Sequence, residues 1–253
     1  MSSKTLQLKS LLKALYLPTM RTYFEEQAKI SIAESHTYED YLLELATQEY
    51  DYRYNNRISR YLKESKLPLE KNMDSFDMER LPGKIKMLVK VLLEGNFLDR
   101  QENVLAFGNP GSGKTHLLCA IAQELIKKGR RIYFSTCSFL VQRLLKAKKD
   151  IKLASELKKL SKYDAIIIDD IGYVHKSREE REVLFTLLAD RYERGSIFLT
   201  SNLPFSKWEK IFRDPMTTAA AIDRLVHHSV ILELNLSSYR LEAARKSKKK
   251  KSG

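Results

Sequence analysis

The sequence predicts an α/β fold with a five-stranded parallel β-sheet, preceded by a small all-helical N-terminal domain. From residue 102 onwards, short β-rich runs alternate with helical stretches, a pattern typical of parallel sheets covered by helices on both faces. Before that point, apolar residues recur at helical spacing. Hydrophobic residues make up 43% of the 253-residue chain, so the chain can bury a sizeable core.

Apolar residues at helical spacing predict the N-terminal helices. A leucine recurs at positions 8, 11, 12 and 15, and Pro18 then interrupts the pattern. A second helix is expected from Thr19 to Ile30, and a third from Tyr38 to Glu64. The inward face of the third helix is expected to carry Tyr41, Leu42, Leu45, Tyr52 and Ile58.

The boundaries between the predicted domains come from composition. The segment from 66 to 83 holds Pro68 and Pro82 and shows little periodicity, which predicts a linker. The stretch from 245 to 251 is almost wholly basic, which is typical of a solvated tail. We therefore expect a helical domain at residues 1–68, a main domain at 69–242 and a basic disordered tail at 243–253.

Five β-rich runs supply the predicted strands of the main domain. They are Asn103–Phe107, Arg131–Ser135, Ala165–Asp169, Ile197–Thr200 and Val230–Leu234. Helical stretches separate them, so neighbouring strands are expected to run parallel.

Charge and composition narrow the class of partner. Lys and Arg total 45 against 32 Asp and Glu, and the net charge of +13 favours polyanions such as nucleic acid. No apolar run approaches the roughly 20 residues of a membrane span, and the N-terminus lacks the apolar core of a signal peptide. Cys119 and Cys137 lie in apolar stretches without metal-binding spacing. We therefore expect a cytoplasmic protein with buried thiols and no membrane partner.

The run from Gly108 to Thr115, here called the phosphate loop, matches the pattern GxxxxGK[ST] between a predicted strand and a predicted helix. Its glycines allow backbone amides to cradle phosphate oxygens at a helix N-terminus. Lys114 is expected to reach the β- and γ-phosphates, and the Thr115 hydroxyl to bind Mg²⁺. The predicted cofactors are ATP and Mg²⁺, and the predicted nucleotide-binding residues are Gly108, Asn109, Pro110, Gly111, Ser112, Gly113, Lys114, Thr115 and His116.

The third β-rich run ends in two carboxylates, Asp169 and Asp170. Ligands of parallel sheets bind at the carboxyl ends of the strands, so both acids are expected beside the phosphate loop. We expect Asp169 to hold the Mg²⁺ shell and Asp170 to orient and polarise the attacking water. Together the two motifs predict an ATPase.

Four further motifs follow in order along the chain. They are Arg191-Tyr192-Glu193-Arg194, Thr200-Ser201-Asn202-Leu203-Pro204, Asp223-Arg224-Leu225-Val226-His227-His228-Ser229 and Ser238-Tyr239-Arg240. As an ordered set they resemble the IstB-like transposition helper ATPases, a branch of the AAA+ proteins near the DnaC helicase loaders. The resemblance covers most of the chain, including the N-terminal helices, and implies an AAA+ P-loop fold.

The resemblance also implies roles for three residues. Asn202 corresponds to the sensor that positions water near the γ-phosphate, and its alternative is an Asn that starts a turn. Arg224 corresponds to an arginine finger that reaches a neighbouring subunit's nucleotide, where such a group is worth ~10³–10⁵ in rate. Its alternative is a salt bridge with Asp223 or Asp190. Arg240 corresponds to a second sensor of the γ-phosphate, with a surface arginine as the alternative.

The sequence departs from the family pattern at the acidic pair. The branch often has Asp-Glu where this chain has Asp169-Asp170, so the geometry that orients the water differs by one methylene. The departure bears on the catalytic rate more than on the existence of the activity, because helicase-loader and initiator relatives commonly carry Asp-Asp.

Related loaders and initiators carry a helical insertion between the second and third strands that faces nucleic acid. The candidate DNA contacts of this segment are Arg143, Lys146, Lys148, Lys149 and Lys152. Each alone fits a solvated helix, but the cluster together with the net charge favours sequence-independent binding to DNA phosphates. The resemblance implies three partners: duplex DNA, the transposase of the same element, and further copies of the chain with ATP between subunits.

Three alternative functions remain open at this point. A replicative helicase loader would prefer single-stranded DNA and bind a helicase. A small-molecule kinase would need a lid and an acceptor pocket, and a basic architectural protein would carry a vestigial phosphate loop. Residues just before Asn103 are candidates for the adenine pocket.

Overall fold

The computed structural model describes residues 3–172, 177–212 and 215–239. Arg240 and the predicted tail at 243–253 lie outside these ranges. Internal contacts divide the chain into two compact units, one up to Arg60 and one from Tyr61 onwards. This division lies a few residues before the predicted boundary at residue 68, which stays a prediction.

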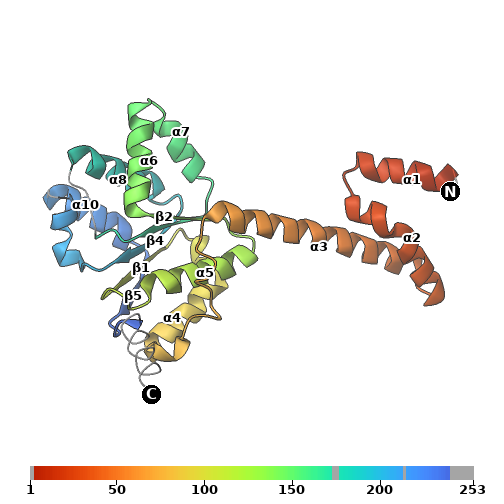
Figure 1. Ribbon diagram of the computed structural model, residues 1–253, viewed down its shortest axis with the longest axis horizontal. Helices are drawn as coiled ribbons and strands as arrows, with labels where there is room; N and C mark the ends of the chain where they lie inside the picture. The colour runs from red at the N-terminus through yellow and green to blue at the C-terminus, as the bar shows by residue number, and fades with distance from the viewer. Residues whose placement is uncertain (1–2, 173–176, 213–214, 240–253) are drawn as a thin grey trace, which may run out of the picture. The chain divides into compact units, whose positions relative to one another are not determined.

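The first unit is helical, as predicted. It consists of α1 (Ser3–Ala14), α2 (Pro18–Ala33) and most of α3 (Tyr38–Ser65) (Figure 1). Phe24 of α2 and Leu45 of α3 are buried, and the Tyr41 hydroxyl donates to the Phe24 carbonyl at 3.1 Å. Pro18 begins α2, where its missing N–H costs nothing.

Two of the predicted inward positions of α3 are wrong. Leu42 is 59% exposed and Tyr52 is 50% exposed. The buried stripe of α3 is narrow, and one turn after Leu45 it is occupied by the polar Glu49. Glu49 accepts hydrogen bonds from the N–H groups of Thr19 and Met20 at 2.8 and 3.1 Å, donors that α2 leaves unpaired at its start.

The second unit contains a five-stranded parallel sheet with the order β2-β3-β4-β1-β5. The strands are β1 (Asn103–Gly108), β2 (Ile132–Thr136), β3 (Ala165–Asp169), β4 (Ser196–Ser201) and β5 (Ser229–Leu234). Each predicted strand matches its observed counterpart to within a residue or two. The α/β prediction is confirmed, and the strand order sets the ends of β1, β3 and β4 side by side.

Helices cover both faces of the sheet (Figure 1). They are α4 (Gly83–Glu94), α5 (Lys114–Lys127), α6 (Cys137–Lys149), α7 (Leu153–Leu160), α8 (Arg178–Arg191), α9 (Glu209–Phe212) and α10 (Pro215–Val226), with the 3₁₀ turns η1 (Met78–Arg80), η2 (Asn96–Leu98) and η3 (Phe205–Lys207). α4 and α5 pack on one face, and α6, α8 and α10 pack on the other. This layering buries both sides of the central strands, which explains their continuous apolar sequences.

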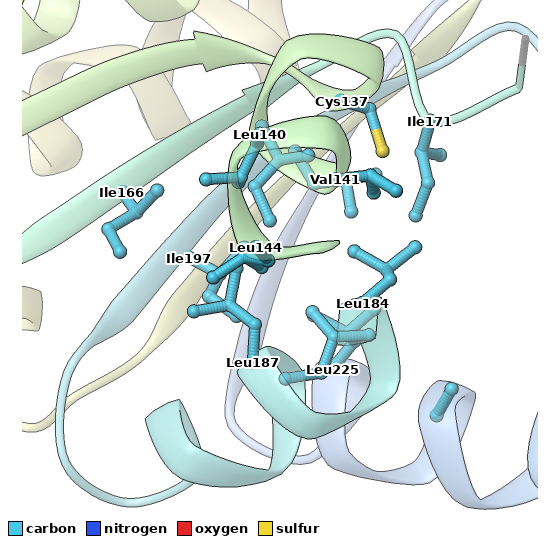
Figure 2. Close-up of a cluster of buried hydrophobic side chains, with 14 of the residues drawn as sticks. Cys137, Leu140, Val141, Leu144, Ile166, Ile171, Leu184, Leu187, Ile197 and Leu225 are labelled. Carbon is cyan, nitrogen blue, oxygen red and sulfur yellow. The ribbon is translucent and has the colours of Figure 1, made fainter. Parts of the chain in front are cut away.

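An apolar core lies between the sheet and helices α6, α8 and α10 (Figure 2). The labelled side chains are Cys137, Leu140, Val141, Leu144, Ile166, Ile171, Leu184, Leu187, Ile197 and Leu225. Burying a side chain of the size of Leu or Ile contributes about 1.5–3 kcal/mol, so this cluster rigidly supports the ends of β3 and β4.

Both cysteines are buried free thiols, as predicted. Burial raises the pKa of Cys119 and of Cys137 to about 12. None of the helices in the described ranges is both long and apolar enough to cross a bilayer.

The predicted linker between 66 and 83 is an ordered strap that lies along α5. The side-chain amide of Gln123 donates to the carbonyls of Lys71, Pro68 and Leu69, with the shortest bond, at 2.9 Å, to Lys71. Because Gln123 is buried, these bonds fix the strap against α5.

Candidate nucleotide-binding site

The phosphate loop joins the end of β1 to the start of α5. Gly111 and Gly113 have φ angles of 81° and 96°, in the left-handed region that favours glycine. A β-carbon at Gly108 would lie 2.2 Å from the Leu234 carbonyl oxygen, and one at Gly111 would lie 2.2 Å from the Ser238 hydroxyl. The glycines are therefore required both by the turn and by the close approach of neighbouring segments.

A cavity of about 820 Å³ opens at this loop, a volume typical of small-molecule sites. Three groups of residues line it. The loop and the start of α5 contribute Pro110 to His116, the strand ends contribute Asp170, Thr200 and Asn202, and two peripheral segments contribute Lys71, Ser75, Phe76, Asp77, Arg80, Leu236, Ser238 and Tyr239. Of the predicted nucleotide-binding residues, Pro110 to His116 therefore share one cavity with Asp170 and Asn202, the residues predicted to orient the water, whereas Gly108 and Asn109 do not line it.

Lys114 is buried at the N-terminus of α5, where the helix dipole is positive. Its ammonium donates to the Gly108 carbonyl at 2.9 Å and to the Asn109 carbonyl at 3.0 Å. These contacts place the charge against the loop, so the loop presents a fixed cation and backbone amides to an anionic oxygen.

Asp169 lies between two hydroxyl groups. Its Oδ1 accepts from Thr115 Oγ1 at 2.7 Å and from Thr200 Oγ1 at 2.6 Å. Mg²⁺ prefers oxygen ligands of this kind, and Thr115 faces the cavity while Asp169 stands directly behind it. The donor set at this point therefore fits Mg²⁺.

Asp170 faces the cavity from an unusual backbone conformation, with φ at 65°. Its N–H donates to Thr200 Oγ1 at 2.8 Å, so one hydroxyl contacts both acidic residues. Burial, and then the negative charge of Asp169, raise the pKa of the Asp170 carboxyl above its ordinary value, against the opposing effect of Lys114. Thr200 was missed as a site residue from the sequence, where a threonine in a β-rich run is an ordinary strand residue.

Two buried polar atoms beside the cavity lack a hydrogen-bond partner among the described residues: Ser112 Oγ and Asn202 Oδ1. Asn202 packs closely on Gly172, where a β-carbon would lie 2.1 Å from its Oδ1. Buried polar groups nearly always have a partner, and both atoms belong to residues that line the same cavity.

The strap and the residues after β5 form the outer part of the cavity. Phe76 packs edge-on against His116 with ring centroids 5.2 Å apart, and His116 Nε2 lies 3.1 Å from Ser75 Oγ. Arg80 donates to the Ser237 carbonyl at 3.0 Å and stacks over the Tyr239 ring. The flat rings of Phe76 and Tyr239 are suited to a nucleobase.

The candidates for the adenine pocket, the residues just before Asn103, do not line this cavity. Residues 95–102 are all described, and none of them lines the cavity. The physical reason is the direction of β1: residues before a strand lie at its amino end, and the phosphate loop follows its carboxyl end. The strap, read from the sequence only as a linker, lies there instead.

Arg224 lies away from this cavity, in a second one of about 240 Å³ near the amino ends of β1 and β4. Its guanidinium stacks over the Phe185 ring at 4.6 Å. Its Nη1 is buried without a hydrogen-bond partner, and it forms no ion pair with the described carboxylates, Asp223 and Asp190 included. The salt-bridge alternative is therefore absent, and Arg224 does not reach the phosphate loop of its own chain.

Arg191 of the Arg-Tyr-Glu-Arg motif is a structural residue. It is 2% exposed and donates to the carbonyl oxygens of Leu160, Tyr163, Asp164 and Ser196. Burial lowers the pKa of its guanidinium to about 10. The first arginine of the motif therefore stabilises the packing of the loops at the amino end of the sheet.

The predicted DNA contacts separate into two groups. Arg143 is half-buried, forms an ion pair with Glu156 and donates to the Tyr133 hydroxyl at 2.7 Å, so it holds α6 to its surroundings. Lys148 is exposed and pairs with Glu182 at 2.8 Å. Lys146, Lys149 and Lys152 are exposed and form no ion pair with any described carboxylate. Arg240 lies outside the described residues.

Comparison with known proteins finds relatives that match most of the chain. A family model described as IstB-like ATP binding protein matches residues 10–247. An insertion sequence ATP-binding protein of Sinorhizobium fredii is 40% identical over 240 residues, which cover 94% of this chain and 80% of that protein. An ATP-binding protein of insertion sequence IS21 from Pseudomonas aeruginosa is 35% identical, covering 95% of this chain and 91% of the relative.

Solved structures establish the fold. The crystal structure of the DnaC helicase loader aligns with a TM-score of 0.53 at 21% identity, covering 69% of this chain and 98% of the loader. AMPPCP-bound DnaA from Aquifex aeolicus aligns with a TM-score of 0.55 at 20% identity, covering 73% of this chain and 56% of DnaA. The predicted AAA+ fold is confirmed.

Proposed function

Because this chain belongs to the IstB-like ATP-binding proteins of insertion sequences, we propose that it is a Mg²⁺-dependent ATPase that assembles on duplex DNA and helps the transposase of the same element to use its insertion target. One observation carries the enzymatic part of the proposal. Thr115, Asp169, Thr200 and Asp170 form a continuous hydrogen-bonded series beside Lys114 at a single cavity.

Each residue of this series has a chemical task. Lys114 and the loop amides bind the phosphates, and Thr115 with Asp169 would hold Mg²⁺, which when bound neutralises charge on the phosphate oxygens. Asp170 accepts a proton from the attacking water, which Asn202 orients from the neighbouring strand.

The location of Arg224 supports a site shared between subunits. Its guanidinium is held by an aromatic ring, pairs with no described carboxylate and lies in a different cavity from the phosphate loop. A guanidinium supplied to a neighbour's triphosphate would complete that neighbour's site. ATP would then stabilise the assembled form, because it binds that form more tightly.

Exposed lysines support the DNA part of the proposal. Lys146, Lys149 and Lys152 are exposed and form no ion pair with a described carboxylate, and the chain has a net charge of +13. Binding through such residues contacts phosphates and not bases, so it would depend on salt and little on sequence.

We also propose domain boundaries at residues 68 and 242 and a cytoplasmic location.

The shared site is tested by mixing two inactive variants, Arg224→Ala and Asp170→Asn, with ATP and duplex DNA. Neither variant alone should turn over ATP. A mixed assembly places the intact Arg224 of one subunit against the intact Asp170 of another, so turnover should return. Arg194→Ala is the matched control, because Arg194 is an exposed arginine whose ion pair within the described part of the chain is with Asp190, at 3.6 Å. Mixtures that stay inactive while sedimenting as assemblies would contradict the shared site.

The helicase-loader alternative makes a different prediction. A loader should bind single-stranded DNA more tightly than duplex, and the likeness to the DnaC structure concerns the fold alone. Competition between the two forms of DNA at equal nucleotide concentration decides between the two functions.

A further inference from the structure

The backbone that carries Arg224 is anchored to the sheet by Asn103. The buried side-chain amide of Asn103 donates to the Leu225 carbonyl at 3.0 Å, and its oxygen accepts the N–H of Ile197 at 2.8 Å. Asn103 therefore joins the last turn of α10 to β1 and β4. Because the last carbonyls of a helix lack partners within the helix, this bond also fixes the turn from which Arg224 projects.

The Arg224 side chain is held in a different way, by the ring of Phe185 on α8. The guanidinium carbon lies 4.6 Å from the ring centroid, within the range of a cation–π contact. Phe185 is partly buried and packs against the apolar core to which α8 and α10 both contribute (Figure 2). The core therefore positions the ring, and the ring positions the charge.

An aromatic ring and a carboxylate use different parts of a guanidinium. A carboxylate binds the N–H edge, which is the edge that a phosphate oxygen would also bind. A ring contacts the flat face and leaves the edge unoccupied. Arg224 forms no ion pair with a described carboxylate; the nearby Asp190 pairs with Arg194 instead. Its Nη1 is buried without a hydrogen-bond partner within the described ranges. The guanidinium is therefore oriented by its face while its N–H edge awaits an acceptor.

We propose that Phe185 is a positioning residue for ATP hydrolysis in the neighbouring subunit: its ring orients the Arg224 guanidinium toward that subunit's triphosphate and leaves the N–H edge free to bind it. This inference rests on the shared site proposed above and adds the residue that prepares the arginine for it. A misplacement of about 1 Å at a reacting group can cost ~100-fold in rate. We therefore expect Phe185→Leu to lower turnover by about 10- to 100-fold, less than the ~10³–10⁵ that an arginine finger can supply.

The test mixes full-length variants in pairs, with ATP and duplex DNA. Phe185→Leu keeps an apolar side chain against the core and removes the ring. Mixed with Asp170→Asn, it supplies an intact Asp170, and the other subunit supplies an intact Phe185 and Arg224. Turnover should then reach the level of the mixture of Arg224→Ala with Asp170→Asn. Mixed with Arg224→Ala, Phe185→Leu should stay low, because every Arg224 present lacks its ring.

Two further variants separate the ring from general packing. Phe185→Tyr keeps an aromatic face and should retain wild-type turnover. Phe134→Leu is the matched control, because Phe134 of β2 is also partly buried and no cation within the described ranges stacks on its ring. If Phe185→Leu lowers the unfolding temperature, Phe185→Met replaces it in the same mixtures.

Each result has one interpretation. A role of Phe185 in the nucleotide site of its own chain would reverse the pattern: Arg224→Ala would restore turnover and Asp170→Asn would not. That reversal would overturn the inference, as would wild-type turnover by Phe185→Leu. Low turnover in both mixtures would also overturn it, because the ring would then serve the fold or a subunit contact. If Arg224→Ala and Asp170→Asn fail to restore each other, the shared site itself is absent, and the inference is overturned with it.

Discussion

The hydroxyl of Thr200 donates a hydrogen bond to the Asp169 carboxylate, with 2.6 Å between the two oxygens. The same hydroxyl accepts the N–H of Asp170 at 2.8 Å. The Thr200 hydroxyl therefore orients the Asp169 carboxylate, which would face Mg²⁺. It also holds the backbone of Asp170, whose side chain would face the water. Because Thr200 is buried at the end of β4, the neighbouring strand determines the geometry of both acids.

Thr200→Val keeps the shape of the side chain and removes the hydroxyl. We expect turnover to fall by about 10- to 100-fold, the usual cost of losing a group that orients a metal ligand. Nucleotide affinity measured by calorimetry without Mg²⁺ should change little, since Lys114 and the loop are untouched. Thr200→Ser restores the hydroxyl and should recover most of the turnover. A valine variant with wild-type turnover across a Mg²⁺ titration would contradict this role.

Gly111→Ala should weaken nucleotide binding and destabilise the fold. The new β-carbon would lie 2.2 Å from the Ser238 hydroxyl, on a backbone with φ at 81°. We expect a loss of more than about 1 kcal/mol in the free energy of unfolding, measured by urea denaturation, together with weaker nucleotide binding by calorimetry. Gly83→Ala is the control, because nothing lies within 4 Å of its β-carbon. Equal effects at both positions would show that the contact with Ser238 is unimportant.

The Glu49 carboxylate should make the first unit sensitive to acid. Burial alone would raise the pKa of Glu49, but hydrogen bonds from Arg53, Met20 and Thr19 outweigh it and lower the pKa below its ordinary value. A lowered folded-state pKa gives stability that is present above the ordinary glutamate pKa of about 4.3 and is lost as the pH falls through the folded value.

Glu49→Gln should therefore destabilise the first unit near neutral pH by about 1–3 kcal/mol and flatten its acid dependence. Hydrogen exchange of the α2 amides between pH 3.5 and 7 reports both effects. Glu44→Gln, at an exposed position of the same helix, should change neither. If the acid dependence persists in Glu49→Gln, a group other than Glu49 causes it.

The sequence was most informative where one physical requirement dominates. The run Ala165–Asp169 is apolar until it meets the acids, and the observed strand has the same bounds. The phosphate loop combines glycine geometry with one lysine, and the structure places it between β1 and α5 as expected. Both signals are local, so neighbouring residues suffice to read them.

Tertiary contacts account for what the sequence did not show. Helix α4 was not anticipated, because it directly follows a proline-containing segment that resembles a linker. The position of that segment depends on Gln123, which lies more than fifty residues away along the chain. Arg143 resembled its lysine neighbours until Glu156 and Tyr133 were found beside it. In each case the missing information was the identity of a distant partner.

The buried guanidinium of Arg191 restricts how this position can vary. Its two terminal nitrogens reach carbonyl oxygens that follow α7 and flank β3 and β4. A lysine has a single nitrogen that cannot span these oxygens in a plane, and a leucine would leave them without donors. The side chain also fills the space above Gly195, where a β-carbon would lie 2.2 Å from Arg191 Nη2, so a larger residue at position 195 would displace this guanidinium. The residues tolerated at position 195 therefore depend on the side chain at position 191.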